Sequence, residues 1–517
     1  MQKLLKGSFI ILIGTIIFRI GGYLYRVLMQ YLLGVEGYGI LSLVIPFQWI
    51  LILIAVAGLP PAVAKYVSEY LAKDDKFMVK QVIITSLKIM LVMSIIFTGL
   101  FFFIARPLAD YLNCGPEVVI LFQAVSFIAP VSVILGLFRG VFQGYQRMTD
   151  IMITRVVEQI FMISLAVVFI LAGFYVLGDV IGSIMGFAIA ALSAVLIFRK
   201  YIWDGLKNVK KPEIPVNEYK LAKKLLIFSS PIIITGLAEL TLFDTGTYII
   251  KLFMDFSSVG YYNIASPVAR LPLVISSSVA VALLPAASEA LALNGSELVK
   301  KYVIHSYRYL FMVLLPLCAV VIIFGQPIMY LLFPNAPLAY NFAGTAMSIL
   351  VIGMAFFSIY GISASVLQGA GKPYPAMFYL VIGTVSNLIL TLLLVPMYGL
   401  NGAAIATMLA SFIVMVLTTL KTIHVTGTQL PYINLLKITL SSFLLAFCML
   451  FMPKTILGFL ISLLLLPVIY ILLLGLTRAL ETRDIILLNK FGNRLGPFSK
   501  PVVKITGFLE SLINKYK

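Results

Sequence analysis

Residues 7–33 read GSFIILIGTIIFRIGGYLYRVLMQYLL, a nearly unbroken run of apolar side chains that Arg19 and Arg26 interrupt. A helix needs about 20 mostly apolar residues to cross the hydrocarbon layer of a membrane, and this stretch exceeds that length. It is too long for the apolar region of a cleaved signal peptide, and no small-residue cleavage site follows it. We therefore predict that residues 7–33 form a retained transmembrane helix.

The whole chain has the composition of a protein that crosses the membrane many times. Of its 517 residues 61% are hydrophobic and 11% are charged, whereas soluble domains are about half apolar and about a quarter charged. The predicted fold class is an all-α polytopic membrane protein of about 14 transmembrane helices. The predicted spans lie near 7–33, 38–66, 79–105, 117–142, 151–175, 177–198, 222–253, 258–288, 302–325, 339–368, 375–397, 401–420, 431–451 and 456–477.

Lysine and arginine indicate the orientation, because cytoplasmic loops carry an excess of both. With the N-terminus in the cytoplasm, only two of the 38 basic residues, Arg106 and Lys454, fall in outer loops. We predict a multi-pass protein of the cell membrane with both termini in the cytoplasm. The net charge of +18 then mainly reflects topology rather than nucleic-acid binding. Lys65, Arg308 and Lys437 lie near cytoplasmic ends of spans, where topology alone explains them.

Three dipeptides recur across the polar connection that follows the sixth span. Recurrence in order at a nearly constant offset predicts two pseudo-symmetric six-helix lobes, related by an axis along the membrane normal. The pairs are Gly37-Tyr38 with Gly260-Tyr261, Leu59-Pro60 with Leu284-Pro285, and Gln143-Gly144 with Gln368-Gly369. The predicted parts are an N-terminal lobe (1–200), a basic cytoplasmic linker (201–221), a C-terminal lobe (222–425), two extra helices (430–478) and a cytoplasmic amphipathic tail (479–517).

Polar residues of the first span share one helix face. Arg19, Tyr23 and Arg26 follow one another at intervals of four and three residues, which places them on one side of a helix. An arginine at the bilayer centre costs about 2.5–3.5 kcal/mol, so this face must line a protein interior or an aqueous cavity. The repeat offset places Asp244 and Lys251 of the seventh span at the depths of Arg19 and Arg26.

Two interpretations of these charges stay open. Arg19 and Arg26 can pair with Asp244 and Glu239 and hold the two lobes together. Alternatively, the cations outnumber the acids, so that the cleft between the lobes binds an anion such as phosphate, which guanidinium groups bind bidentately. The candidate residues are Arg19, Arg26, Arg270, Tyr23, Lys251 and Arg139 for substrate binding, with Asp244 and Glu239 for charge balance or ion coupling.

The sequence offers no motif for ATP hydrolysis, for a metal or for a cofactor. QGAGKP at 368–373 is an imperfect phosphate loop, because Val366 stands where glycine is required and Pro373 replaces serine or threonine. The two histidines lie at opposite ends of unrelated spans. The longest outer loops contain only Asp110 as an acid, which disfavours an integral glycosyltransferase or saccharide polymerase. We expect a transporter rather than an enzyme.

Three glycine-rich motifs resemble those of polysaccharide-transporter flippases, which belong to the multidrug/oligosaccharidyl-lipid/polysaccharide exporter superfamily. They are Leu33-Gly-Val-Glu-Gly-Tyr-Gly39, Gly58-Leu-Pro60 and Phe138-Arg-Gly-Val-Phe-Gln-Gly144. Length and span number resemble the stage V sporulation protein B branch and, more distantly, the lipid II flippases. The resemblance implies two six-helix lobes, a central cavity open alternately to either side, and two extra helices. It also implies that Arg19 and Arg26, and by extension Arg270, bind head-group phosphates.

The sequence therefore leads to the hypothesis of a flippase that moves polyprenyl-phosphate- or pyrophosphate-linked saccharides from the inner to the outer leaflet. The expected partners are the lipid bilayer, the anionic lipid-linked saccharide and a coupling Na⁺ or H⁺, and no nucleic acid. The alternative is a cation-coupled multidrug or small-molecule antiporter of the same superfamily, in which Asp244 and Glu239 handle cations. The absence of an acid from residues 7–33 favours the flippase.

Overall fold

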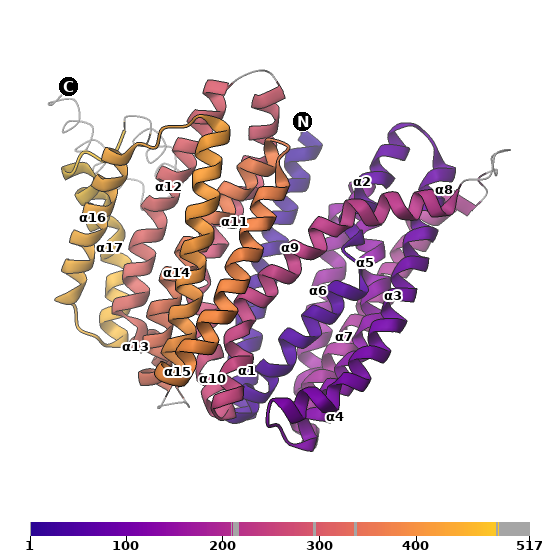
Figure 1. Ribbon diagram of the computed structural model, residues 1–517, viewed down its shortest axis with the longest axis horizontal. Coiled ribbons are helices and arrows are strands. Elements are labelled where there is room, and N and C mark those ends of the chain that lie inside the picture. Colours follow the sequence, from indigo (N-terminus) through magenta and orange to yellow (C-terminus); the bar gives the residue numbers. More distant parts are fainter. Residues whose placement is uncertain are drawn as a thin grey trace. The chain divides into compact units, whose positions relative to one another are not determined.

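A computed structural model of the chain describes the backbone of residues 2–207, 209, 217–292, 296–334, 339–481 and 484. Side chains are described for the same residues except 2–20, 281, 282, 284–286, 288–292, 296 and 339–342. Every regular element of the described backbone is a helix (Figure 1), as expected in lipid, where a segment must satisfy its own backbone polar groups. The helices are α1 (Gln2–Ala55), α2 (Leu59–Ala72), α3 (Lys76–Tyr111), α4 (Pro116–Ser126), α5 (Ile128–Gly144), α6 (Met148–Phe169), η1 (Ile170–Phe174), α7 (Tyr175–Phe198), η2 (Arg199–Trp203), α8 (Asp204–Lys207), α9 (Glu218–Phe253), α10 (Phe256–Ala269), α11 (Leu271–Ala292), α12 (Ser296–Ile323), α13 (Gly325–Leu332), α14 (Ala339–Gly369), α15 (Pro373–Thr426), α16 (Tyr432–Leu450) and α17 (Ile456–Leu476).

Ten helical stretches of the described residues are long and apolar enough to cross a membrane. Three of them hold two predicted spans each, because the backbone bends sharply at Gly34, Gly173 and Gly399. At Gly34 the φ angle is 72°, in the left-handed region that glycine adopts without steric cost. Helices α10 and α11 make up the remaining span, near 258–288. The predicted all-α class with about 14 spans is confirmed.

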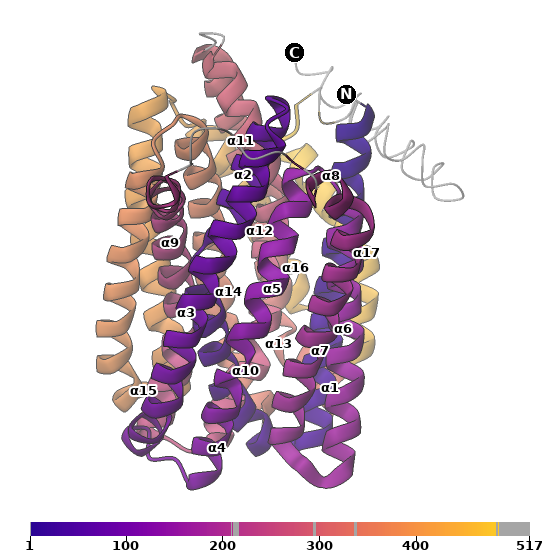
Figure 2. The same ribbon diagram turned by 90° about the vertical axis from the view of Figure 1, so that its right-hand side faces the viewer.

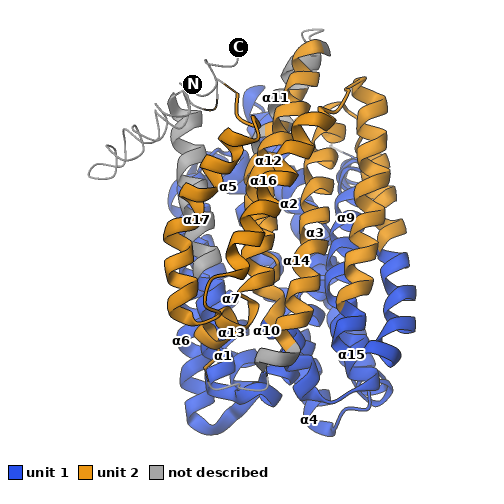
Figure 3. Ribbon diagram, turned by 90° about the vertical axis from the view of Figure 1, so that its left-hand side faces the viewer, with its two compact units in different colours: residues 1–264, 384–403 blue, residues 265–383, 404–517 orange. Residues whose placement is uncertain are grey.

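The chain divides into two compact units, which Figure 3 shows in two colours. Unit 1 contains residues 1–264 and 384–403, and unit 2 contains residues 265–383 and 404–517. The middle of α15 therefore belongs to unit 1 and its two ends belong to unit 2. The lobes, linker and tail predicted from the sequence stay a prediction. Residues 208, 210–216 and 485–517, which make up parts of the predicted linker and tail, lie outside the described residues.

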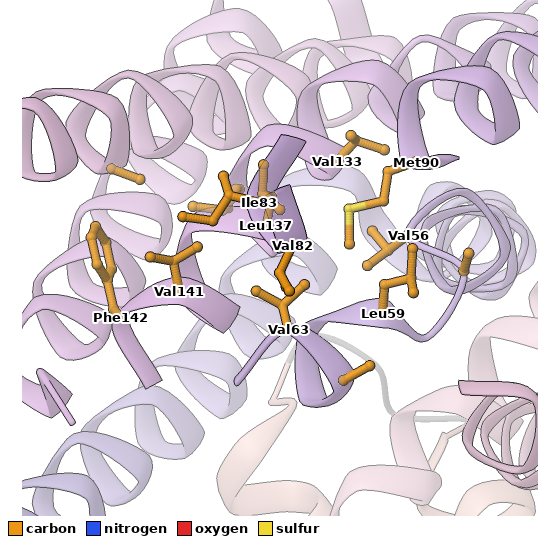
Figure 4. Close-up of a cluster of buried hydrophobic side chains, with 14 of the residues drawn as sticks. Val56, Leu59, Val63, Val82, Ile83, Met90, Val133, Leu137, Val141 and Phe142 are labelled. Atoms are coloured by element: carbon orange, nitrogen blue, oxygen red, sulfur yellow. The ribbon is translucent and has the colours of Figure 1, made fainter. Parts of the chain in front are cut away.

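The core of unit 1 is formed by α2, α3, α5 and α7, which pack side by side (Figures 1 and 2). Val63 of α2, Val82 of α3 and Leu137 of α5 are buried in one cluster (Figure 4). A Cβ atom on Gly140 of α5 would lie only 2.8 Å from the carbonyl oxygen of Pro60 in α2. Small residues of this kind let helices approach closely in a membrane, where packing rather than removal of apolar surface from water drives association.

In unit 2, α12 packs against α11, α14 and α16, and α16 packs against α17. Val303 and Leu310 of α12 and Ile362 of α14 belong to one buried cluster. The hydroxyl groups of Tyr307 on α12 and Ser363 on α14 are 2.6 Å apart. Apolar contacts and this buried hydrogen bond together fix the rotation of α12 about its axis, and hence the direction in which Arg308 and Tyr309 point.

Candidate functional site

The polar face predicted for the first span lies on α1. Tyr23 and Arg26 are partly buried there, and Gln30, one turn further along, is 3% exposed. Among the residues that the structure describes, no carboxylate forms an ion pair with Arg26. The side chain of Arg19 lies outside the described residues. Arg26 therefore offers a guanidinium group on a membrane-spanning helix with no described anion to neutralise it.

The second predicted polar face lies on α9, which packs against α1. Asp244 is partly buried and Glu239 is exposed. Lys251 is 7% exposed, its Nζ donates a hydrogen bond to the carbonyl oxygen of Asn113 at 3.2 Å, and the same Nζ lies 4.4 Å from the centre of the Phe256 ring. A carbonyl oxygen and an aromatic ring hold an ammonium group in place but do not neutralise its charge.

Asp255, in the connection after α9, supplies a negative charge near Lys251. The hydrogen bond with Ser258 holds the pKa of the Asp255 carboxyl below its ordinary value, and the charge of Lys251 lowers it further. The backbone N–H of Ser258 donates to this carboxylate at 2.9 Å. Asp255 therefore stays ionised at neutral pH, and it balances part of the positive charge at this end of α9.

Arg139 of α5 is part of an ion pair. Its Nη2 atom lies 2.6 Å from Oε2 of Glu158 on α6, and its Nε donates to the hydroxyl of Thr154 at 3.1 Å. The side chain of Arg139 is 21% exposed and that of Glu158 is 5% exposed. The two charges compensate each other, so Arg139 contributes less to an electropositive site than Arg26 does.

Arg270 lies between α10 and α11, and its backbone N–H donates to the carbonyl oxygen of Ser266 at 3.0 Å. Its side chain is partly buried. Arg270 belongs to unit 2, whereas the other seven candidate residues belong to unit 1. A joint role of Arg270 and the α1 face in binding one ligand stays a prediction.

Two segments that the internal repeat relates, 35–39 and 256–261, lie against each other in unit 1. A Cβ atom on Gly39 would overlap the carbonyl oxygen of Phe256, and one on Gly260 would overlap the carbonyl oxygen of Val35. Backbone therefore meets backbone at this point, and any side chain at either glycine would push the segments apart. Gly260 belongs to one of the Gly-Tyr dipeptides noted in the sequence, whereas a Cβ atom on Gly37 of the other would meet the hydroxyl of Tyr175 on α7.

Asp179 of α7 is a buried acid that the sequence patterns did not point to. Its side chain is 2% exposed, and the hydroxyl of Tyr25 on α1 donates to its two oxygens at 2.7 and 2.8 Å. An acid within an apolar span is a signal in its own right, but Asp179 is close to the predicted outer end of its span and has no basic residue at helical spacing.

Comparison with known families gives two matches. A family model described as polysaccharide biosynthesis protein matches residues 4–291, and a second, described as MatE, matches residues 231–393. The first match covers the α1 face, α9 and every candidate residue named above. The second includes Asp244, Lys251 and Arg270.

Curated relatives span most of the chain. Stage V sporulation protein B of Bacillus subtilis (strain 168) is 26% identical over 430 residues, which cover 78% of this chain and 80% of that protein. The lipid II flippase MurJ of the same strain is 24% identical over 441 residues, covering 79% of this chain and 80% of that protein. A solved structure of the lipid II flippase MurJ in an inward closed conformation superposes with a TM-score of 0.74 and 16% identity, covering 92% of this chain and 99% of that chain. The likeness to this structure shows a shared fold.

Proposed function

Because the chain belongs to the polysaccharide biosynthesis protein family, we propose that it is a flippase for saccharides linked to polyprenyl phosphate or pyrophosphate. It would carry them from the inner to the outer leaflet by alternating access. The relative whose name supports this substrate class is the lipid II flippase described above. The helices of the described chain that are long and apolar enough to cross a membrane are consistent with transport across the bilayer.

The observation that carries the proposal is Arg26. It lies partly buried on the polar face of a membrane-spanning helix, and no described carboxylate pairs with it. By contrast, Arg139 is neutralised by Glu158 at 2.6 Å. A guanidinium group without a partner in lipid is costly, and a phosphate group is an anion that such a group binds in a bidentate manner.

Within this proposal the candidate residues have different roles. Arg19, Arg26 and Arg270 bind the phosphates, and Tyr23 lies on the same face of α1 as Arg26. Lys251 adds positive charge at the end of α9, whereas Arg139, which Glu158 neutralises, is a candidate for substrate contact without a net charge. Asp244 and Glu239 balance the cations when no substrate is bound, or take up a coupling Na⁺ or H⁺.

The membrane potential can drive such a transporter without ATP. One charge that crosses 100 mV gains about 2.3 kcal/mol. A pyrophosphate-linked lipid that carries about two negative charges outward would gain about 5 kcal/mol if it crossed the whole field. We place the protein in the cell membrane with both termini in the cytoplasm, and we assign it no catalytic activity.

Reconstituted vesicles test the proposal. The purified protein would be offered a fluorescent lipid-linked oligosaccharide, and the fraction reaching the outer leaflet would be measured. Arg26→Gln should lower the flipping rate about tenfold or more, the effect of losing about 1.4 kcal/mol of binding. Arg155→Gln, which changes an exposed arginine of α6, is the matched control and should flip normally. Normal flipping by Arg26→Gln in a correctly folded protein would refute the role of the α1 face.

A cation-coupled antiporter is the second candidate, because the MatE match includes Asp244 and Glu239. This function predicts that Asp244→Asn and Glu239→Gln impair transport more than Arg26→Gln does. The same vesicles would be loaded with a cationic dye. Dye efflux that depends on a Na⁺ or H⁺ gradient, together with no movement of the lipid-linked saccharide, would favour the antiporter.

A further inference from the structure

An apolar groove lies in unit 2 between α12, α16 and α17, which stand side by side in Figure 1. Its volume is about 710 Å³. Aliphatic side chains form its walls, among them Leu317 of α12, Leu445 of α16 and Leu466 of α17. Polar atoms enter the lining at the end where α17 stops, which is the end predicted to be cytoplasmic.

Residues 477–481 and Asp484, which we call the strap, follow α17, and Leu480 and Asp484 lie at this end of the groove. Leu480 and Asp484 of the strap and Tyr309 of α12 are part of the groove lining. Asp484 is 5% exposed and Leu480 is 8% exposed. The strap is therefore packed into the mouth of the groove.

Arg308 of α12 is the centre of the attachment, and it is only 1% exposed. Its guanidinium group forms an ion pair with the Asp484 carboxylate, and Nη1 lies 3.3 Å from an Asp484 oxygen as well. Nη2 also donates to the carbonyl oxygen of Ala479 at 2.9 Å, and Nη1 lies 3.3 Å from Oε1 of Glu481. A cation this deeply buried is tolerated only while an anion is bound to it.

In the other hydrogen bonds between the helices and the strap, the helix side chain is also the donor and the strap is the acceptor. The Tyr309 hydroxyl donates to Asp484 at 3.1 Å. The Asn434 side-chain nitrogen donates to the carbonyl oxygen of Ala479 at 3.2 Å, and its oxygen accepts from Nε of Arg308 at 3.2 Å. Nζ of Lys437 lies 3.5 Å from the carbonyl oxygen of Arg478. These donors of the helices meet carboxylate and carbonyl oxygens of the strap.

We propose that Arg308, Tyr309, Asn434 and Lys437 form a binding site for the phosphate of an anionic phospholipid, and that the strap occupies this site with its own carboxylates. A phosphodiester presents two acceptor oxygens to a guanidinium group as a carboxylate does. The acyl chain of the same lipid lies in the apolar groove. Binding of the lipid displaces Asp484 and releases the strap. The position of the strap therefore depends on the membrane lipid. The proposal does not depend on the identity of the transported substrate.

Trypsin reports the position of the strap. Trypsin cleaves the peptide bond between Arg478 and Ala479. Because Arg308 binds the carbonyl oxygen of Ala479, this bond should resist cleavage while the strap is docked. The full chain in nanodiscs of phosphatidylcholine would be compared with the chain in nanodiscs that also contain phosphatidylglycerol. We expect phosphatidylglycerol to speed the formation of fragment 1–478, measured by intact mass, about tenfold, which corresponds to a shift of about 1.4 kcal/mol in docking.

Two variants separate an anion site from a simple tether. Arg308→Gln should be cleaved rapidly in both nanodiscs. Asp484→Asn removes a carboxylate from the strap but keeps Arg308. Its cleavage should be faster than that of the unaltered chain in phosphatidylcholine and should still speed up with phosphatidylglycerol. Arg147→Gln is the matched control, because Arg147 also pairs with an aspartate, Asp150, but in unit 1. It should respond to phosphatidylglycerol as the unaltered chain does.

Three results would overturn the proposal. The unaltered chain could be cleaved at the same rate in both nanodiscs. The Arg308→Gln chain could respond to phosphatidylglycerol as strongly as the unaltered one. Inorganic phosphate added to phosphatidylcholine nanodiscs could release the strap as well as the lipid does, and the site would then bind a free anion rather than a phospholipid.

Discussion

The hydroxyl of Tyr25 donates to both carboxylate oxygens of Asp179, at 2.7 and 2.8 Å, although the two residues are 154 positions apart. Both side chains are buried, Tyr25 at 8% and Asp179 at 2% exposure. The bond connects α1, one residue before Arg26, to α7. It thus fixes the rotation of the helix whose polar face carries the proposed substrate arginines.

Removing this hydroxyl should destabilise unit 1. Tyr25→Phe leaves the buried Asp179 carboxyl without its phenol donor, a loss of about 1–3 kcal/mol. Thermal unfolding of the purified protein in detergent would measure it. Tyr31→Phe, at a position that is 64% exposed, is the control and should unfold at the unaltered temperature. Equal unfolding temperatures for the two variants would show that the bond contributes no stability.

A larger side chain at Gly140 should force α5 away from α2. The Cβ atom would meet the Pro60 carbonyl oxygen at 2.8 Å, and backbone cannot move aside as a flexible side chain can. We expect Gly140→Leu to cost about 1–3 kcal/mol or more, seen as a lower unfolding temperature and poorer recovery in detergent. Gly99→Leu places the same side chain where no atom lies within 4 Å, and it should be tolerated. Similar losses from both variants would contradict the close α2–α5 contact.

The contact between segments 35–39 and 256–261 should matter for transport. If the segments must meet and separate in each cycle, Gly260→Ala should lower the flipping rate, because the added Cβ overlaps the carbonyl oxygen of Val35. The vesicle assay would compare it with Gly99→Ala, for which there is open space. Undiminished flipping by Gly260→Ala would mean that the cycle does not require the contact.

The pH dependence of Cys114 alkylation should reveal the effect of the Lys251 charge on the Cys114 thiol. Burial raises the pKa of the Cys114 thiol, the nearby Lys251 charge lowers it, and Glu117 raises it. Since the thiolate is the reactive form, alkylation should be slow at neutral pH and speed up as the pH rises toward this raised pKa. Lys251→Gln removes the lowering influence, so the pH profile of alkylation should move to higher pH.

The alkylation experiment has a charge-conserving control. Lys251→Arg keeps the positive charge and should leave the profile near that of the unaltered chain. The measurements need a background with Cys318→Ser and Cys448→Ser, so that one thiol reacts. A shift to lower pH in Lys251→Gln would mean that Lys251 does not act on Cys114 through its charge.

Part of the site could be predicted from the sequence because it depends on spacing within one helix. Tyr23 and Arg26 share the polar face of α1, as their interval of three residues requires. Gly260 could be singled out because the Gly-Tyr dipeptide that contains it is repeated in the sequence, but its contact partner Val35 could not. The partners of the charges were not predictable in the same way. Arg308 looked like a topology signal near a helix end, yet it is 1% exposed and paired with Asp484, 176 residues away.

The sequence by itself determined that this is an all-α membrane protein, because the cost of placing side chains in lipid is set locally, about 20 residues at a time. It also determined which face of α1 must avoid lipid. Only the tertiary structure decided which charges are neutralised. Glu158 forms an ion pair with Arg139, Asp484 forms one with Arg308, and no described acid forms one with Arg26. The physical reason is that an ion pair between helices depends on which helices pack together and on how each is rotated about its axis. The hydropathy of the sequence specifies neither the packing partners nor the rotation.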